Sequence, residues 1–106
     1  MDNKEEQPIE MVSFEIIANA GEARSLAFQA LDEAKQGHFD VADELMKKSD
    51  ESATLAHKAQ TDLLFAEMNG KKTPVDVLLV HSQDHLMTSM LASELIKEII
   101  ELYKNK

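Results

Sequence analysis

Two histidines and an aspartate stand close together in one short polar segment, His81-Ser82-Gln83-Asp84-His85. In a helix, side chains three and four positions apart share one face, so this spacing places His81, Asp84 and His85 side by side. Apolar residues flank the segment, and burying such polar groups without partners is costly. Histidine is the side chain best suited to act as a neutral nucleophile near neutral pH, with one ring nitrogen free to attack. The segment is therefore the candidate for chemistry.

The spacing alone leaves other interpretations open. A helical histidine flanked by aliphatic residues is more often structural or simply exposed, because polar clusters coincide with functional sites only some of the time. Histidines at i and i+4 are also a familiar zinc-binding spacing, and Asp84 could add an oxygen ligand. The segment lacks the glutamate of the metalloprotease motif, and a third protein ligand would have to come from elsewhere. A catalytic zinc centre is therefore the less favoured chemistry.

The remaining histidines and the methionines give weaker signals. His57 lies in a helical segment, and we interpret it as a packed or partly exposed residue rather than a ligand. His38 follows Gly37 at a predicted helix junction, where an imidazole commonly hydrogen-bonds terminal carbonyl groups. The six methionines, which include Met87 and Met90 near the cluster, are typical of flexible core packing. We assign none of these residues a chemical role.

Composition excludes several classes of function. The chain has no cysteine, so it has no disulfide, no thiolate metal site and no thiol nucleophile. Lys and Arg number 11 against 20 Asp and Glu, and the resulting net charge of −9 disfavours nucleic acid and anionic membrane surfaces as partners. The acidic start of the sequence is unlike a signal peptide, and no apolar run is long enough to span a bilayer. We expect neither nucleic-acid binding nor membrane insertion.

Hydrophobic periodicity predicts three long helices: one over about residues 8–36, one over about residues 40–69, and a third that begins after Thr73 or Asp76 and continues to about Tyr103. Pro8 suits a first helical turn, and Gly37 suits the left-handed residue that closes a helix. Gly21 is an exception inside the first helix, and we interpret it as a close approach to another helix or a slight bend. Along the first helix, apolar and small residues recur at threes and fours in one stripe: Ile9, Val12, Ile16, Ala20, Ala23, Ala27, Ala30 and Ala34.

The second and third helices follow the same logic. Asn69-Gly70 ends the second, and either Thr73 or Asp76 could cap the third. The third helix has more apolar residues than one core stripe requires, which favours burial against another copy of the chain. The predicted inner stripe of the second helix is Val41, Leu45, Ser49, Ser52, Leu55, Ala56, Ala59, Leu63 and Ala66.

Short connections require neighbouring helices to run antiparallel, so we predict an all-α, antiparallel up-down-up three-helix bundle. The length of 106 residues suits a single domain over residues 1–106, and we expect a disordered N-terminus of about seven residues.

Three separated motifs resemble those of a known family. They are Ala20-Gly21-Glu22-Ala23-Arg24-Ser25-Leu26-Ala27, Ala56-His57-Lys58-Ala59-Gln60-Thr61 and Val80-His81-Ser82-Gln83-Asp84-His85-Leu86-Met87-Thr88. In order and spacing they are similar to the enzyme IIA component of the lactose/cellobiose class of the bacterial phosphoenolpyruvate-dependent sugar phosphotransferase system. The resemblance extends from about Ile9 to Tyr103. The commonest family form has Ala at the position of Ser82 and often Asn at that of Glu22, and neither change touches the reacting imidazole.

The resemblance implies a cytoplasmic homotrimer and a relay function. His81 would accept a phosphoryl group from the phosphocarrier protein HPr and deliver it to a cysteine of the cognate IIB component during uptake of a β-linked disaccharide. Asp84 would lie near the threefold axis, where three copies share one divalent metal ion, expected to be Mg²⁺. His85 would orient or hydrogen-bond the site, and Gln83 would contact phosphoryl oxygens. The alternative is a trimeric metal-binding structural or regulatory adaptor without phosphotransfer.

Overall fold

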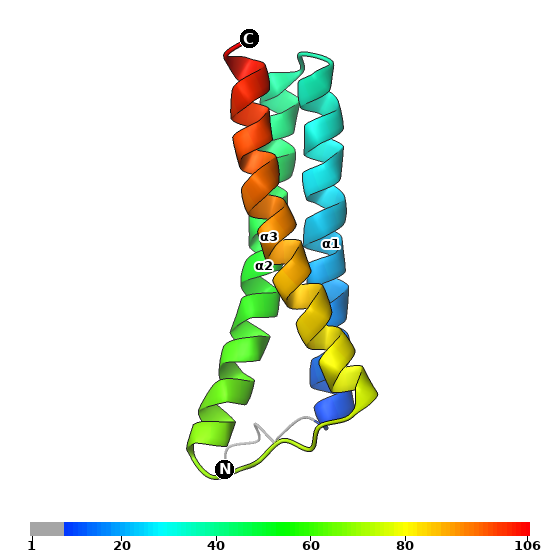
Figure 1. The fold of residues 1–106 in the computed structure, drawn as a ribbon, viewed down its shortest axis with the longest axis vertical. Helices are drawn as coiled ribbons and strands as arrows, with labels where there is room; N and C mark the ends of the chain where they lie inside the picture. Colours follow the sequence, from blue (N-terminus) through cyan, green and yellow to red (C-terminus); the bar gives the residue numbers. More distant parts are fainter. Residues whose placement is uncertain (1–7) are drawn as a thin grey trace.

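A computed structural model describes residues 8–106, which form three helices: α1 (Ile9–Lys35), α2 (Phe39–Met68) and α3 (Val77–Lys104). Figure 1 shows α1 and α3 running in the same direction, with α2 reversed beside them. No strand occurs within residues 8–106. The predicted all-α up-down-up bundle is confirmed, and the predicted bounds of α1 and α2 and the predicted end of α3 agree within one residue. The predicted disordered start of the chain lies outside the described residues.

Turn residues and caps end the helices where the sequence predicts. Gly37 and Gly70 adopt φ angles of 83° and 91°, the left-handed conformation that glycine tolerates best. Asp76 caps α3, since its side chain accepts a hydrogen bond from the backbone N–H of Leu79 at 2.8 Å. The sequence left Thr73 and Asp76 as alternative N-caps, and the structure shows that Asp76 is the cap.

Two details at the helix ends differ from expectation. Pro8 occupies the N-cap position of α1, with φ −55° and ψ 146°, rather than the first helical turn. His38 at the turn between α1 and α2 does not bind a terminal carbonyl, because its Nδ1 lies 2.7 Å from the side-chain Oε1 of Glu33. A carboxylate so close offers the ring a stronger hydrogen-bond acceptor than a backbone carbonyl does.

Small residues on α1 allow both other helices to pack closely on it. The buried side chains of α1 are Ser13, Ile16, Ala20, Ala23, Ala27, Ala30 and Ala34. Ser49 on α2 donates a 2.6 Å hydrogen bond to the carbonyl of Ala23, joining the two backbones through one hydroxyl. α1 contacts α2 and α3 extensively, whereas α2 and α3 contact each other far less. The core therefore lies along α1.

The inner stripe predicted for α2 is partly wrong. Val41 and Leu55 are 48% and 51% exposed, while Ala42 and Met46 are buried in their place. In a helix, neighbouring positions differ in direction by about 100°, so a choice between Val41 and Ala42 rotates the buried face by that amount. Packing of α2 against the alanines of α1 places the smaller residue, Ala42, on the buried face in preference to Val41.

Ion pairs and a hydrogen bond tie α3 to α2 along one edge. Lys104 Nζ lies 2.9 Å from Asp43 Oδ1, and Lys97 Nζ lies 3.0 Å from Asp50 Oδ1. The hydrogen bond from Lys104 to Asp43 raises the pKa of that ammonium above its usual value of 10.5. This edge of α3 therefore faces α2, which fixes the direction in which the rest of the helix points.

Gly21 is not explained by a close approach within the chain. A Cβ added there would meet no atom within 4 Å, so the interpretation as a contact with another helix of the same bundle is wrong. The half-exposed position faces away from the core that Ala20 and Ala23 share with α2 and α3.

Candidate functional site

The histidine pair predicted from the sequence is present on α3. The rings of His81 and His85 meet edge to face, with centroids 4.5 Å apart and planes at 90°. His81 is exposed and His85 is half-buried, and no residue within 8–106 hydrogen-bonds to the ring of His81. An exposed imidazole supported by a second ring is geometrically free to receive a group from outside the chain.

His85 has one nitrogen with an unusual environment. Its Nδ1 is buried and has no hydrogen-bond partner among the described residues. Buried N–H groups without an acceptor are rarer than buried acceptors without a donor, so we assign the proton to Nε2. In that tautomer, Nε2–H is the group that His85 can donate to an atom bound at His81.

Asp84 lies on the same face but makes a different set of contacts. It is exposed, and its backbone carbonyl accepts a 2.7 Å hydrogen bond from Thr88 Oγ1. Its carboxylate has no partner within residues 8–106, and nowhere in this range do three His, Cys, Asp or Glu side chains gather around a possible metal position. One chain therefore offers a metal ion a single carboxylate here.

Gln83 points to the opposite edge of α3. Its Nε2 donates to Gln60 Oε1 of α2 at 2.7 Å, so within one chain it faces α2 while His81 and His85 face away from it. The sequence alone assigns Gln60 no role. Its place in the Ala56-His57-Lys58-Ala59-Gln60-Thr61 motif and its spacing from the buried Ala56 and Ala59 were the available signals.

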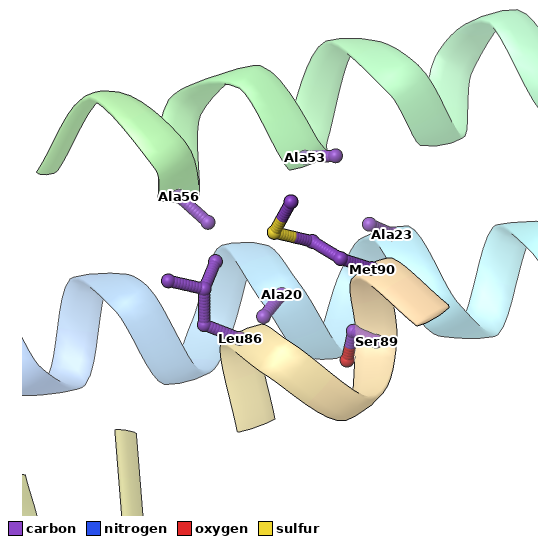
Figure 2. Close-up of a pocket in the computed structure, with 7 residues that line it drawn as sticks. All are labelled: Ala20, Ala23, Ala53, Ala56, Leu86, Ser89 and Met90. Atoms are coloured by element: carbon purple, nitrogen blue, oxygen red, sulfur yellow. The ribbon is translucent and has the colours of Figure 1, made fainter. Parts of the chain in front are cut away.

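The helix segment that carries the histidines rests on small side chains. Figure 2 shows Leu86 and Met90 reaching from α3 toward alanines of α1 and α2. Leu86 is 4% exposed and packs in one cluster with Ile16 and Ala20 of α1. A small apolar hollow remains, lined by Ala20, Ala23, Ala53, Ala56, Leu86, Ser89 and Met90. These contacts fix the position along the bundle axis of the α3 turn that carries His81 and His85.

The other two histidines lie outside the cluster. His57 is exposed on α2, and His38 pairs with Glu33 at the far end of α1. None of the three helices combines the length and the apolar content needed to cross a membrane within the part of the chain described.

The described residues thus form a small three-helix bundle with an exposed imidazole beside a second ring on α3. The comparisons identify the family. Residues 11–104 match the family described as "PTS system, Lactose/Cellobiose specific IIA subunit". Because this match spans most of the sequence, the chain belongs to the lactose/cellobiose-specific IIA family of the phosphotransferase system.

Named relatives and solved structures agree with this assignment. The lactose-specific EIIA component of Staphylococcus epidermidis is 45% identical over 96 residues, which cover 91% of this chain and 92% of the relative. The cellobiose-specific enzyme IIA of Bacillus anthracis has a similar structure, with a TM-score of 0.90, 45% identity and coverage of 98% of this chain and 95% of that one.

A third comparison involves a complex. The IIA(Chitobiose) chain of the N,N'-diacetylchitobiose branch of Escherichia coli, solved together with HPr, is 46% identical with a TM-score of 0.81. The similarity covers 94% of this chain and 97% of that one. Sequence and fold therefore support the same family.

Proposed function

We propose that this chain is a cytoplasmic phosphocarrier that accepts a phosphoryl group on His81 and passes it to a second protein. The observation that carries the proposal is the exposed ring of His81, held edge to face 4.5 Å from His85 on a helix of a family whose members are phosphotransferase components. A neutral ring nitrogen of His81 forms a bond to phosphorus as the bond from phosphorus to the donor breaks. In the second step, the new N–P bond breaks as the acceptor binds the same phosphorus.

Protein partners supply both the donor and the acceptor. The similar IIA(Chitobiose) of Escherichia coli forms a complex with HPr, which supports HPr as the donor to this chain. The acceptor is a cysteine of the cognate IIB component, whose thiolate takes the phosphoryl group during uptake of a sugar. The names of the relatives include lactose, cellobiose and diacetylchitobiose, so the sugar is a β-linked disaccharide.

The outward face of α3 supports assembly into a homotrimer. It lies opposite the buried face and carries large apolar side chains at threes and fours, the spacing of a helix that packs on other helices. These residues are more than half exposed in the single chain, and contiguous exposed apolar surface is typical of subunit contacts. They are Val77, Val80, Met87, Leu91, Leu95 and Leu102.

Asp84 lies within this apolar face, so a threefold axis along it would bring three carboxylates together. Three adjacent carboxylates repel one another unless a proton or a cation is bound between them. Oxygen ligands suit a hard divalent cation such as Mg²⁺. In this proposal Asp84 of each subunit holds one shared ion, which offsets the repulsion among the three carboxylates and takes no part in the transfer itself.

His85 and Gln83 complete the proposed site in different ways. The ring of His85 lies beside that of His81, and in this proposal its Nε2–H donates to a phosphoryl oxygen there, which stabilises charge as the group arrives. Gln83 faces the other edge of α3, so it contacts the phosphoryl group on His81 of a neighbouring subunit rather than its own. The bond to Gln60 holds the Gln83 amide in place for that contact.

The test is incorporation of phosphate from phosphoenolpyruvate in the presence of enzyme I and HPr. We expect one acid-labile phosphate per chain in the wild type and in His57→Ala, which changes an exposed histidine on α2. We expect none in His81→Ala. Labelling of His81→Ala, or absence of label from the wild type with an active donor, would contradict the proposal.

A further inference from the structure

The charged residues in the second half of α3 fall into two groups that face different directions. Lys97 and Lys104 face α2, where they pair with aspartates at 3.0 Å and 2.9 Å. Glu94, Glu98 and Glu101 lie between these lysines and the outward apolar face, at spacings of four and three residues that form one row. We call this row the acidic edge. The carboxylates of Glu94 and Glu98 have no ion pair within residues 8–106.

α1 carries a row of the opposite charge. Arg24 and Lys35 directly follow the buried Ala23 and Ala34, so both point about 100° away from the core in the same direction. Both are exposed, and neither has an ion pair in the part of the chain that the structure describes. We call this row the basic edge. The other residues that directly follow buried residues of α1 carry no charge: Phe14, Ile17, Gly21, Phe28 and Leu31.

The two edges lie on opposite sides of the bundle. On α3, residues that directly follow buried ones face α2, as the contacts of Gln83 and Lys97 show. Because α1 and α3 run in the same direction, their side chains turn in the same sense (Figure 1). The two helices have α2 on opposite hands, so residues that directly follow buried ones on α1 point away from α2. The basic edge is therefore on the side of His81, and the acidic edge is on the side of α2.

The two edges also have similar heights along the bundle. Ala23 lines the same hollow as Ser89 and Met90, so Arg24 is level with the start of the acidic edge to within about one helical turn (Figure 2). The rise per residue is the same in both helices, so Lys35 is level with the end of that edge. Each positive charge thus has a negative charge near its own height.

A cyclic assembly on the outward face of α3 brings unlike edges together. Rotation about an axis parallel to the helices preserves height and sets one edge of each subunit against the opposite edge of the next. In a trimer, a basic edge therefore meets an acidic edge at all three seams. An antiparallel pair of subunits would set acidic edge against acidic edge. Each copy has a net charge of −9, so a seam of like charge would add to an existing repulsion.

From this arrangement we infer that the basic edge of one subunit pairs with the acidic edge of the next, with Arg24 and Glu94 as the central pair, and that this pairing selects the parallel, cyclic assembly. Arginine suits this role because its planar guanidinium can bind a carboxylate through two parallel hydrogen bonds. Arg24 is the only arginine in the sequence. The inference rests on the homotrimer of the proposed function, and it gives the motif of residues 20–27 a role in assembly.

Charge reversals test the pairing. Arg24→Glu leaves each subunit with two acidic edges, and Glu94→Arg weakens the acidic edge by reversing its first charge. The double variant restores the pair with its charges exchanged. The control is Lys48→Glu, which changes the net charge as much as Arg24→Glu does. Lys48 is exposed, directly precedes the buried Ser49 and so lies on the edge of α2 opposite Asp50, away from α3.

The readout is the chain concentration at the midpoint of assembly, measured by sedimentation at low ionic strength, with circular dichroism as the check that the helices form. Each single reversal replaces an attraction with a repulsion at three seams, so we expect this concentration to rise at least about tenfold. The double variant and Lys48→Glu should stay within about threefold of the wild type. In about 1 M salt, where the Debye length is about 3 Å, the single variants should recover much of their loss.

An equimolar mixture of Arg24→Glu and Glu94→Arg subunits distinguishes a ring of three from a two-fold pair. In a ring of three, at least one seam joins two subunits of the same kind, so the mixture should assemble less tightly than the double variant. In a parallel two-fold pair, both contacts would join unlike subunits. Full recovery in the mixture would therefore overturn the inference.

Three other results would also overturn it: wild-type assembly of both single variants, a folded double variant that does not recover, or a wild type that stays monomeric at all concentrations. Phosphorylation of the wild type by HPr is a separate readout. Absence of that label with an active donor would reject the phosphocarrier proposal, whereas sedimentation reports on the seams alone.

Discussion

Buried serines provide a stability test in which one type of substitution has opposite effects at two sites. Ser49 on α2 is fully buried and donates its 2.6 Å hydrogen bond to the carbonyl of Ala23. Ser89 on α3 is 3% exposed, and its hydroxyl has no partner among residues 8–106. Ser13 on α1, 1% exposed, is in the same situation. We expect Ser49→Ala to lower the free energy of unfolding and Ser89→Ala to raise it.

The size of the difference follows from three contributions. Because alanine has the higher helix propensity, replacing serine with alanine in a helix interior raises the free energy of unfolding by about 0.5 kcal/mol at both sites. At Ser49 a hydrogen bond with a net value of about 1 kcal/mol is lost, so the variant is less stable by about 0.5 kcal/mol. At Ser89 the change removes an unpaired buried hydroxyl, whose desolvation costs about 1 to 3 kcal/mol, so the variant gains at least about 1.5 kcal/mol.

The assay is thermal and urea unfolding followed by circular dichroism at one chain concentration, because association also raises Tm. A difference of about 2 kcal/mol in the free energy of unfolding between the two variants corresponds to a difference of roughly 8 to 16 °C in Tm for a domain of this size. Ser13→Ala serves as a second example and should behave like Ser89→Ala. If Ser89→Ala lowered Tm as much as Ser49→Ala, the hydroxyl of Ser89 would have to be hydrogen-bonded, and the reasoning would be refuted.

Two further changes test the assembly and the start of α3. In the proposed trimer, Asp84→Leu would replace three mutually repelling carboxylates with apolar surface, so we expect that trimer to persist or tighten. Monomers in sedimentation would argue against an axial Asp84. Asp76→Ala removes the acceptor for Leu79 N–H and should lower the free energy of unfolding by about 1 kcal/mol in urea titrations. Asp76→Asn keeps an acceptor, so it should retain most of the wild-type stability. Equal losses in these two variants would exclude capping as the cause.

Local rules determined the helices and the histidine pair. Gly37, Asn69-Gly70 and Asp76 end or begin helices through backbone preferences that depend on a few neighbouring residues. The contact between His81 and His85 follows from helix geometry alone, since side chains four positions apart are neighbours on any helix. These features could therefore be predicted before the arrangement of the helices was known.

Only the tertiary structure decided which face of each helix is buried and which hydrogen bonds join one helix to another. Val41 and Ala42 fit a helical stripe equally well, and packing on the alanines of α1 chose Ala42. The bond between Gln83 and Gln60 joins residues 23 positions apart on different helices. A period of about 3.6 residues gives the existence of a helix, but small and apolar residues on several faces leave its rotation open. That rotation is set by contacts between residues distant in sequence, which periodicity does not encode.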